Sequence, residues 1–125
     1  MSARRVVVID DDDDIRAVAR LALERVAGWE VHLAASGPEG VDLAARVRPD
    51  AILLDVMMPG VDGPATVELL RARAETAAVP VVLLTASTTA DDRRRLESLG
   101  VAGLVPKPFD PLTVHRDVAA VLGWT

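Results

Sequence analysis

The chain has 125 residues, of which 50% are hydrophobic and 26% are charged, so we expect one folded domain, residues 1–125, with a core of ordinary size. It has no cysteine, which excludes disulfide bridges, cysteine-ligated zinc and a thiol nucleophile. The net charge of −5 argues against direct nucleic-acid binding, and neither a signal peptide nor a membrane-spanning apolar stretch is present, so we expect a cytoplasmic protein.

Five short runs of apolar, often β-branched residues predict buried strands. They are Arg5–Ile9, Glu30–Ala34, Ala51–Asp55, Val81–Thr85 and residues 102–105. Apolar residues at helical spacing follow each run and predict helices. These helices are expected over about residues 13–27, 37–47, 64–74, 90–99 and 110–122.

Several of the expected helices have a recognisable start, among them the second, where Ser36 to Glu39 has the form of a capping box, and the fifth, at Asp110-Pro111. Either Asp12 or Asp13 is expected to cap the first helix, because a short acidic side chain accepts hydrogen bonds from the free backbone amides there. Thr88 and Asp91 form a Ser/Thr-x-x-acid signal, which predicts the start of the fourth helix.

Strands that alternate with helices predict an α/β protein, with a parallel sheet, right-handed crossovers and helices on both faces. We therefore predict a (βα)5 flavodoxin-like three-layer sandwich. The pattern by itself does not determine the order of the strands, and 2-1-3-4-5 is the natural candidate for five of them.

Polar side chains stand at the carboxyl ends of four predicted strands. Asp10 and Asp11 follow the first strand, Asp55 ends the third, Thr85 ends the fourth, and Lys107 stands just past the fifth. In the order 2-1-3-4-5 the first and third strands are neighbours about 4.8 Å apart, so their carboxylates meet. A lone aspartate here would be explained as a helix cap, but this is also the edge where open α/β sheets bind ligands.

These residue types together suit phosphoryl transfer. Three adjacent carboxylates repel one another, and oxygen ligands without histidine or cysteine suit Mg²⁺, with Mn²⁺ as an alternative. Lys107 is the only lysine among fourteen basic residues, and lysine is a compact, mobile charge that arginine does not replace. We predict Asp55 as the nucleophile, with the cations neutralising charge on the transferring group.

Four segments at the ends of the predicted strands carry a family resemblance. They are VVVIDDDDDIR (residues 6–16), LLDVMMPGVDG (residues 53–63), LLTAS (residues 83–87) and PKPF (residues 106–109). Each segment alone is moderately specific. In this order and spacing they resemble the receiver domain of response regulators in two-component signalling, a family that includes CheY, and the resemblance covers the whole chain.

The resemblance implies a phosphoacceptor and a metal site. Asp55 would accept a phosphoryl group from the phosphohistidine of a sensor histidine kinase or a phosphotransfer protein. Asp11 and Asp55 would bind Mg²⁺ directly, the backbone carbonyl of Met57 would supply a third ligand, and Asp10 would act through a bound water. Phosphorylation and dephosphorylation would be autocatalytic, and the chain would not be a metabolic enzyme.

The resemblance also implies a switch. Lys107 would pair with the phosphoryl oxygens, and its peptide bond to Pro108 is usually cis in the family. Thr85 would move to hydrogen-bond the phosphoryl group, while the small Ala86 leaves room for it. The family usually has tyrosine or phenylalanine where this chain has Leu104, so an aromatic ring cannot report the movement of Thr85. The fourth helix, fifth strand and fifth helix would form the responding face.

The expected partners are a kinase or phosphotransfer protein and a downstream protein target or effector domain, with a phosphorylation-dependent homodimer as a further alternative. We expect a stand-alone regulator, and an excised piece of a longer protein is the other interpretation. Two other functions remain open. One is an aspartate-nucleophile phosphatase, although Met57 breaks the D-x-D pattern of those enzymes, and the other is an adaptor that binds partners without phosphorylation.

Overall fold

The computed structural model describes residues 3–124, and a single parallel sheet forms its centre. The strands are β1 (Arg5–Ile9), β2 (Glu30–Ala34), β3 (Ala51–Asp55), β4 (Val81–Thr85) and β5 (Gly103–Pro106). They pair in the order β2-β1-β3-β4-β5, with every pair parallel. The predicted strand order is therefore confirmed, and β1, β3 and β4 lie in the middle of the sheet.

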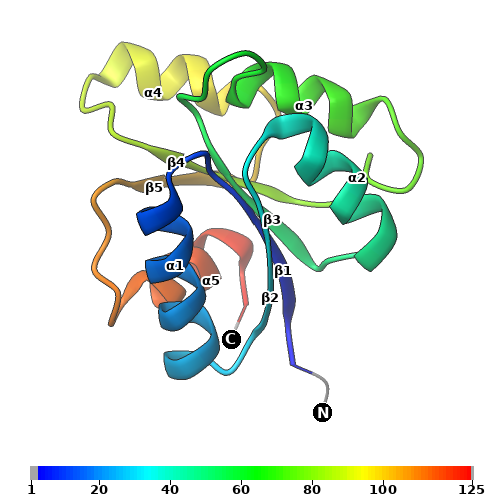
Figure 1. Cartoon of the computed structure of the whole chain (residues 1–125). Coiled ribbons are helices and arrows are strands. Elements are labelled where there is room, and N and C mark those ends of the chain that lie inside the picture. The colour runs from blue at the N-terminus through cyan, green and yellow to red at the C-terminus, as the bar shows by residue number, and fades with distance from the viewer. Residues whose placement is uncertain (1–2, 125) are drawn as a thin grey trace.

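Helices cover both faces of the sheet. They are α1 (Asp13–Leu21) with the π-helical turn η1 (Ala22–Val26) that continues it, α2 (Gly37–Val47), α3 (Gly63–Arg71), α4 (Ala90–Glu97) and α5 (Val114–Leu122). In Figure 1, α1 and α5 lie on one face, and α2, α3 and α4 lie on the other. The predicted three-layer (βα)5 sandwich is confirmed. Within residues 3–124, no helix combines the length and apolarity that a membrane crossing requires.

The central strands are apolar along their whole length because both of their faces are covered. In β3, Ile52 and Leu54 belong to the hydrophobic cluster beneath α2, α3 and α4, whereas Ala51 and Leu53 belong to the cluster beneath α1 and α5. All five residues of β3 are buried, including Asp55. The continuous apolar pattern that predicted these strands thus reflects burial on two sides.

Asp12 caps α1, which decides between the two predicted candidates. Its carboxylate accepts hydrogen bonds from the backbone amides of Asp14 (2.8 Å) and Ile15 (3.2 Å). The helical path continues through η1 and ends before Gly28, whose φ of 74° is a left-handed conformation that glycine adopts without strain.

One predicted helix cap is wrong by one residue, and one predicted helix start is wrong by four, whereas α4 begins at the predicted residue, Ala90. The cap of α4 is Thr89, whose hydroxyl accepts from the amide of Asp92 (3.2 Å), and not the predicted Thr88. α5 begins at Val114 rather than near Asp110. Before it, the Asp110 carboxylate accepts from the amide of Leu112 (2.8 Å), so these residues form a turn and not a first helical turn.

Candidate functional site

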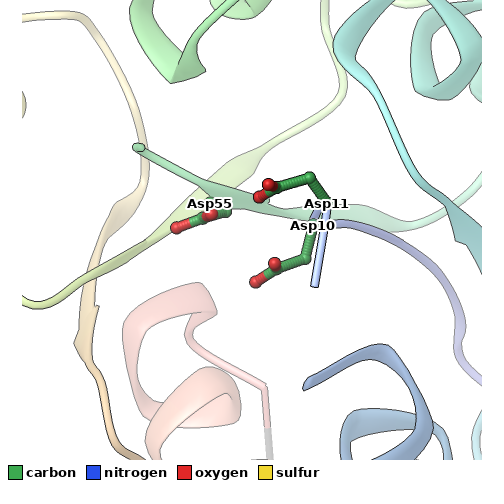
Figure 2. Close-up of side chains that lie close together, drawn as sticks. All are labelled: Asp10, Asp11 and Asp55. Carbon is green, nitrogen blue, oxygen red and sulfur yellow. The ribbon is translucent and has the colours of Figure 1, made fainter. Parts of the chain in front are cut away.

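Three carboxylates meet at the carboxyl edge of the sheet. Asp10 follows β1 directly, and Asp55 ends β3; these positions lie opposite one another because Ile9 pairs with Leu54 in the strand register. Asp11 is exposed, Asp55 is buried, and Asp10 is fully buried. One carboxylate oxygen from each of the three residues lies within 4.8 Å of the other two. Figure 2 shows the three side chains close together.

Lys107 completes this group from the loop after β5. Its Nζ donates hydrogen bonds to Asp10 Oδ2 (3.0 Å) and to Asp55 Oδ1 (3.2 Å). Its backbone amide donates to the carbonyl of Thr85 at the end of β4 (2.8 Å), and its peptide bond to Pro108 is cis. The lysine is therefore fixed at its backbone beside β4, and its side chain spans the gap to β3 and β1.

The electrostatics of the group are those of two buried carboxylates sharing one cation. Burial raises the pKa of Asp55, and the negative charge of Asp10 raises it further, while Lys107 opposes both effects. Burial lowers the pKa of Lys107, but its hydrogen bonds to Asp10 and Asp55 and their negative charges outweigh burial, so this pKa is raised. The lysine therefore stays charged, whereas Asp55 is held in an environment that disfavours its own charge.

Thr85 lies beside this group but is engaged elsewhere. It is buried, and its Oγ1 accepts a hydrogen bond from the amide of Ser87 (3.0 Å). Among residues 3–124 its hydroxyl makes no hydrogen bond to Asp55. Thr85, Ala86 and Met57 line a pocket of about 370 Å³ between this edge of the sheet and α4, and the Met57 side chain is 79% exposed.

Leu104 is the one predicted site residue that lies away from this edge. It stands in β5 opposite Leu83 of β4, and it is partly buried against the hydrophobic cluster that includes Leu83 and Leu96. Its side chain therefore packs against the core on the face that α4 covers, and it is not among the residues that line the pocket beside Thr85.

Sequence reasoning did not identify the contribution of Arg16. Its Nη1 donates to the backbone carbonyl of Asp10 (2.6 Å), and its Nη2 pairs with the carboxylate of Asp13. The carboxylate of Asp10 in turn accepts from the amide of Asp12 (2.9 Å). Five successive aspartates were the available signal, because a run of negative charge that folds into one loop needs a nearby counter-charge.

The three carboxylates fit a hard divalent cation. Their oxygen atoms lie close enough together to act as ligands of one ion, and carboxylate oxygens are the ligands that Mg²⁺ prefers. Lys107 already offsets part of their charge, but Asp11 faces solvent and makes the group accessible from outside. The residues present therefore fit a cation such as Mg²⁺, which Asp10, Asp11 and Asp55 would hold beside Lys107.

Comparison with known proteins gives one consistent answer. The family model described as "response regulator receiver domain" matches residues 6–119. PrrA of Mycobacterium leprae, a transcriptional regulatory protein, is 41% identical over 122 residues, which cover 98% of this chain and 51% of PrrA. RpaA of Synechocystis, a DNA-binding dual master transcriptional regulator, is 37% identical over 118 residues, which cover 94% of this chain and 48% of RpaA. The chain thus spans about half the length of these relatives.

Solved structures agree with the sequence comparison. The chemotaxis response regulator CheY4 of Vibrio cholerae has a TM-score of 0.88 and 31% identity, covering 96% of this chain and 99% of that chain. The receiver domain of Francisella response regulator 1452 has a TM-score of 0.83 and 26% identity, covering 96% and 97%. With the matching family model and the acidic site at the sheet edge, these similarities show that the chain belongs to the response regulator receiver domain family.

Proposed function

We propose that this receiver domain is the phosphoacceptor of a two-component phosphorelay and that Asp55 receives the phosphoryl group. The observation that carries the proposal is the position of Asp55, buried at the end of β3, beside Asp10 and Asp11 and 3.2 Å from Lys107 Nζ. The donor would be the phosphohistidine of a sensor histidine kinase or of a phosphotransfer protein. Such a partner acts in the cytoplasm, which is where we expect this chain.

The transfer exchanges one bond to phosphorus for another. A carboxylate oxygen of Asp55 attacks phosphorus, a P–O bond forms, the P–N bond of the phosphohistidine breaks, and the imidazole leaves and takes up a proton. Lys107 is already within hydrogen-bond distance of Asp55, so its ammonium group can follow the negative charge onto the phosphoryl oxygens. Attack of water on phosphorus then breaks the P–O bond to Asp55, releases inorganic phosphate and returns the Asp55 carboxylate to its starting state.

Asp10, Asp11 and Asp55 would hold Mg²⁺, or Mn²⁺ in its place, with the backbone carbonyl of Met57 as a further ligand. When bound, the ion would neutralise negative charge on the transferring phosphoryl group. Asp10 also holds Lys107 in place through its hydrogen bond, so the same carboxylate would help to position both the lysine and the ion.

Phosphorylation would change the surface that partners recognise. Thr85 would turn its hydroxyl toward the phosphoryl group, and the exposed Ala86 beside it offers no bulk that would oppose the movement. The face formed by α4, β5 and α5 would then bind a downstream protein or an effector domain, or a second copy of the chain. Since the relatives are longer proteins named as transcriptional regulators, nucleic-acid binding in a full-length protein would belong to another domain.

Intact-mass analysis after incubation with acetyl phosphate and Mg²⁺ tests this function. We expect one added phosphoryl group in the wild type, none with a chelator, and none in Asp55→Asn. Asp117→Asn, which removes an exposed carboxylate from α5, is the matched control and should behave as the wild type. A phosphate monoester should not be turned over.

Uptake by Asp55→Asn would show that another residue is the acceptor. If the wild type takes up no phosphoryl group and beryllofluoride, a phosphoryl mimic, does not perturb it either, the chain would be an adaptor that works without phosphorylation.

A further inference from the structure

A chain of hydrogen bonds leads from Thr85 at the end of β4 to the first turn of α4. The Ser87 amide donates to Thr85 Oγ1 (3.0 Å), and the Ser87 hydroxyl donates to Asp92 Oδ2 (3.0 Å). The other carboxylate oxygen of Asp92 lies 3.6 Å from Arg95 Nη2, one turn further along α4. Ser87 therefore contacts Thr85 through its backbone and α4 through its side chain.

The role of Asp92 in this chain is unusual for its position in the helix. Thr89 caps α4 and accepts from the amide of Asp92 (3.2 Å), which is one half of a capping box. In a complete capping box the acidic side chain would reach back to the amide of the cap residue. Here its carboxylate accepts from Ser87 instead, so the loop before α4 is bound to the first turn of the helix by a side chain.

Leu104 stands at the position where an aromatic side chain usually responds to the movement of this threonine in the family, and its side chain offers no polar group. The Leu104 side chain can neither donate nor accept a hydrogen bond, and it is partly buried against the hydrophobic cluster that contains Leu83 and Leu96. The pocket of about 370 Å³ is lined by Thr85, Ser87 and Asp92, among other residues, and it gives the loop between β4 and α4 space to move. The hydrogen-bonded link thus lies where movement is permitted.

We infer that Ser87 is the positioning residue that transmits the state of Thr85 to α4. The inference rests on the proposed function, because phosphorylation of Asp55 is the event that would move Thr85. Ser87 is then the residue through which this movement reaches α4. While Thr85 Oγ1 accepts from the Ser87 amide, the loop is held and the Ser87 hydroxyl fixes Asp92. When the Thr85 hydroxyl turns toward phosphoryl oxygens on Asp55, it releases the Ser87 amide, and the displaced Ser87 carries Asp92 and the first turn of α4 with it.

Hydrogen–deuterium exchange of the α4 amides, measured with and without beryllofluoride and Mg²⁺, tests whether a phosphoryl mimic at Asp55 alters α4 through Ser87. In the wild type we expect exchange in the first turn of α4 to change by about fivefold, the usual effect of one hydrogen bond. In Ser87→Ala and in Asp92→Ala, each of which removes one partner of the Ser87–Asp92 hydrogen bond, the change at equal beryllofluoride occupancy should fall below about twofold. Thr88→Ala, from the same loop, is the control and should retain the full response. A full response in Ser87→Ala would overturn the inference.

A second arm without any phosphoryl mimic separates this inference from the proposed function. Thr85→Val keeps the shape of the buried side chain and removes the acceptor of the Ser87 amide. We expect it to alter exchange in the first turn of α4 by about fivefold in the wild-type background and by less than about twofold in the Ser87→Ala background. Equal effects in both backgrounds, or none in either, would overturn the coupling. If the wild type binds no beryllofluoride, the proposed function fails. The Thr85→Val comparison still shows whether Ser87 couples Thr85 to α4.

Discussion

The ammonium group of Lys107 lies 3.2 Å from Asp55 Oδ1, although 52 residues separate the two in the chain. The fold brings them together because the lysine follows the edge strand β5, whereas Asp55 ends the central strand β3, with β4 between them. Since Lys107 also donates to Asp10, one cation serves two buried carboxylates and controls the charge of the nucleophile that we propose.

Replacing this lysine should change the acidity of Asp55. In Lys107→Met the attraction that opposes burial and the charge of Asp10 is lost, so the pKa of Asp55 in the metal-free protein should rise further. Phosphoryl uptake from acetyl phosphate should fall by about tenfold or more. Titration of the Asp55 carboxyl carbon by NMR and the rate of uptake measure the two effects. Arg46→Met, on the exposed face of α2, is the control, and an unchanged pKa in Lys107→Met would contradict the prediction.

Neutralising Asp55 should stabilise the metal-free protein at neutral pH. Burial and the charge of Asp10 raise the pKa of Asp55 above its value in the unfolded chain, so its ionised form costs folding free energy. Asp55→Asn should therefore increase the free energy of unfolding by about 1 kcal/mol. This increase in the free energy of unfolding should be present at pH values above the folded-state pKa of Asp55. It should vanish as the pH falls through that pKa, because the Asp55 carboxyl group of the wild type is then neutral as well.

Urea unfolding of the wild type and Asp55→Asn across this pH range, in the presence of a chelator, measures the difference. Asp117→Asn serves again as the control for loss of one exposed negative charge. If the stability difference between Asp55→Asn and the wild type grows as the pH falls, it does not arise from burial of the Asp55 charge and its repulsion by Asp10.

Mg²⁺ should stabilise the folded chain through the three carboxylates. A ligand that binds only the folded state adds about 1.4 kcal/mol for each tenfold excess over its Kd. Asp11→Asn should weaken Mg²⁺ binding by about tenfold or more, yet it should change metal-free stability little because Asp11 is exposed. Thermal unfolding across a Mg²⁺ titration tests this. Asp14→Asn, in the same acidic run but outside the carboxylate group, should keep the wild-type response.

Removing the guanidinium of Arg16 should destabilise the loop that carries Asp10. Arg16→Met leaves the backbone carbonyl of Asp10 without the side-chain donor that now lies 2.6 Å away, and it removes a positive charge beside the run of aspartates. We expect a loss of about 1–2 kcal/mol in the free energy of unfolding. Arg16→Lys should recover part of it, while the exposed Arg25→Met on η1 should have little effect. Urea unfolding distinguishes these outcomes, and equal losses in both methionine variants would refute the specific role of Arg16.

The sequence by itself determined the five strands and the edge at which polar side chains meet. Apolar runs such as Ala51–Asp55 are long enough and uniform enough to indicate strands covered on both faces, and that pattern is local. In a parallel sheet the carboxyl ends of all strands lie at one edge. Since each of them follows or ends a strand, this edge carries the side chains of Asp10, Asp11, Asp55 and Thr85, and no interatomic distance is needed to predict it. Roles that depend on a bound metal, such as the Met57 carbonyl as a ligand, stay predictions.

Tertiary structure alone decided how those groups contact one another. Lys107 reaches both Asp10 and Asp55 because its backbone is bound to the end of β4, and no local pattern encodes that distance. The same holds for Arg16, because its guanidinium group donates to the backbone carbonyl of Asp10 only where the start of α1 brings the two groups together. Hydrogen bonds join groups only when the folded backbone sets their distance and direction, whereas burial of apolar residues leaves a repeating pattern along the chain.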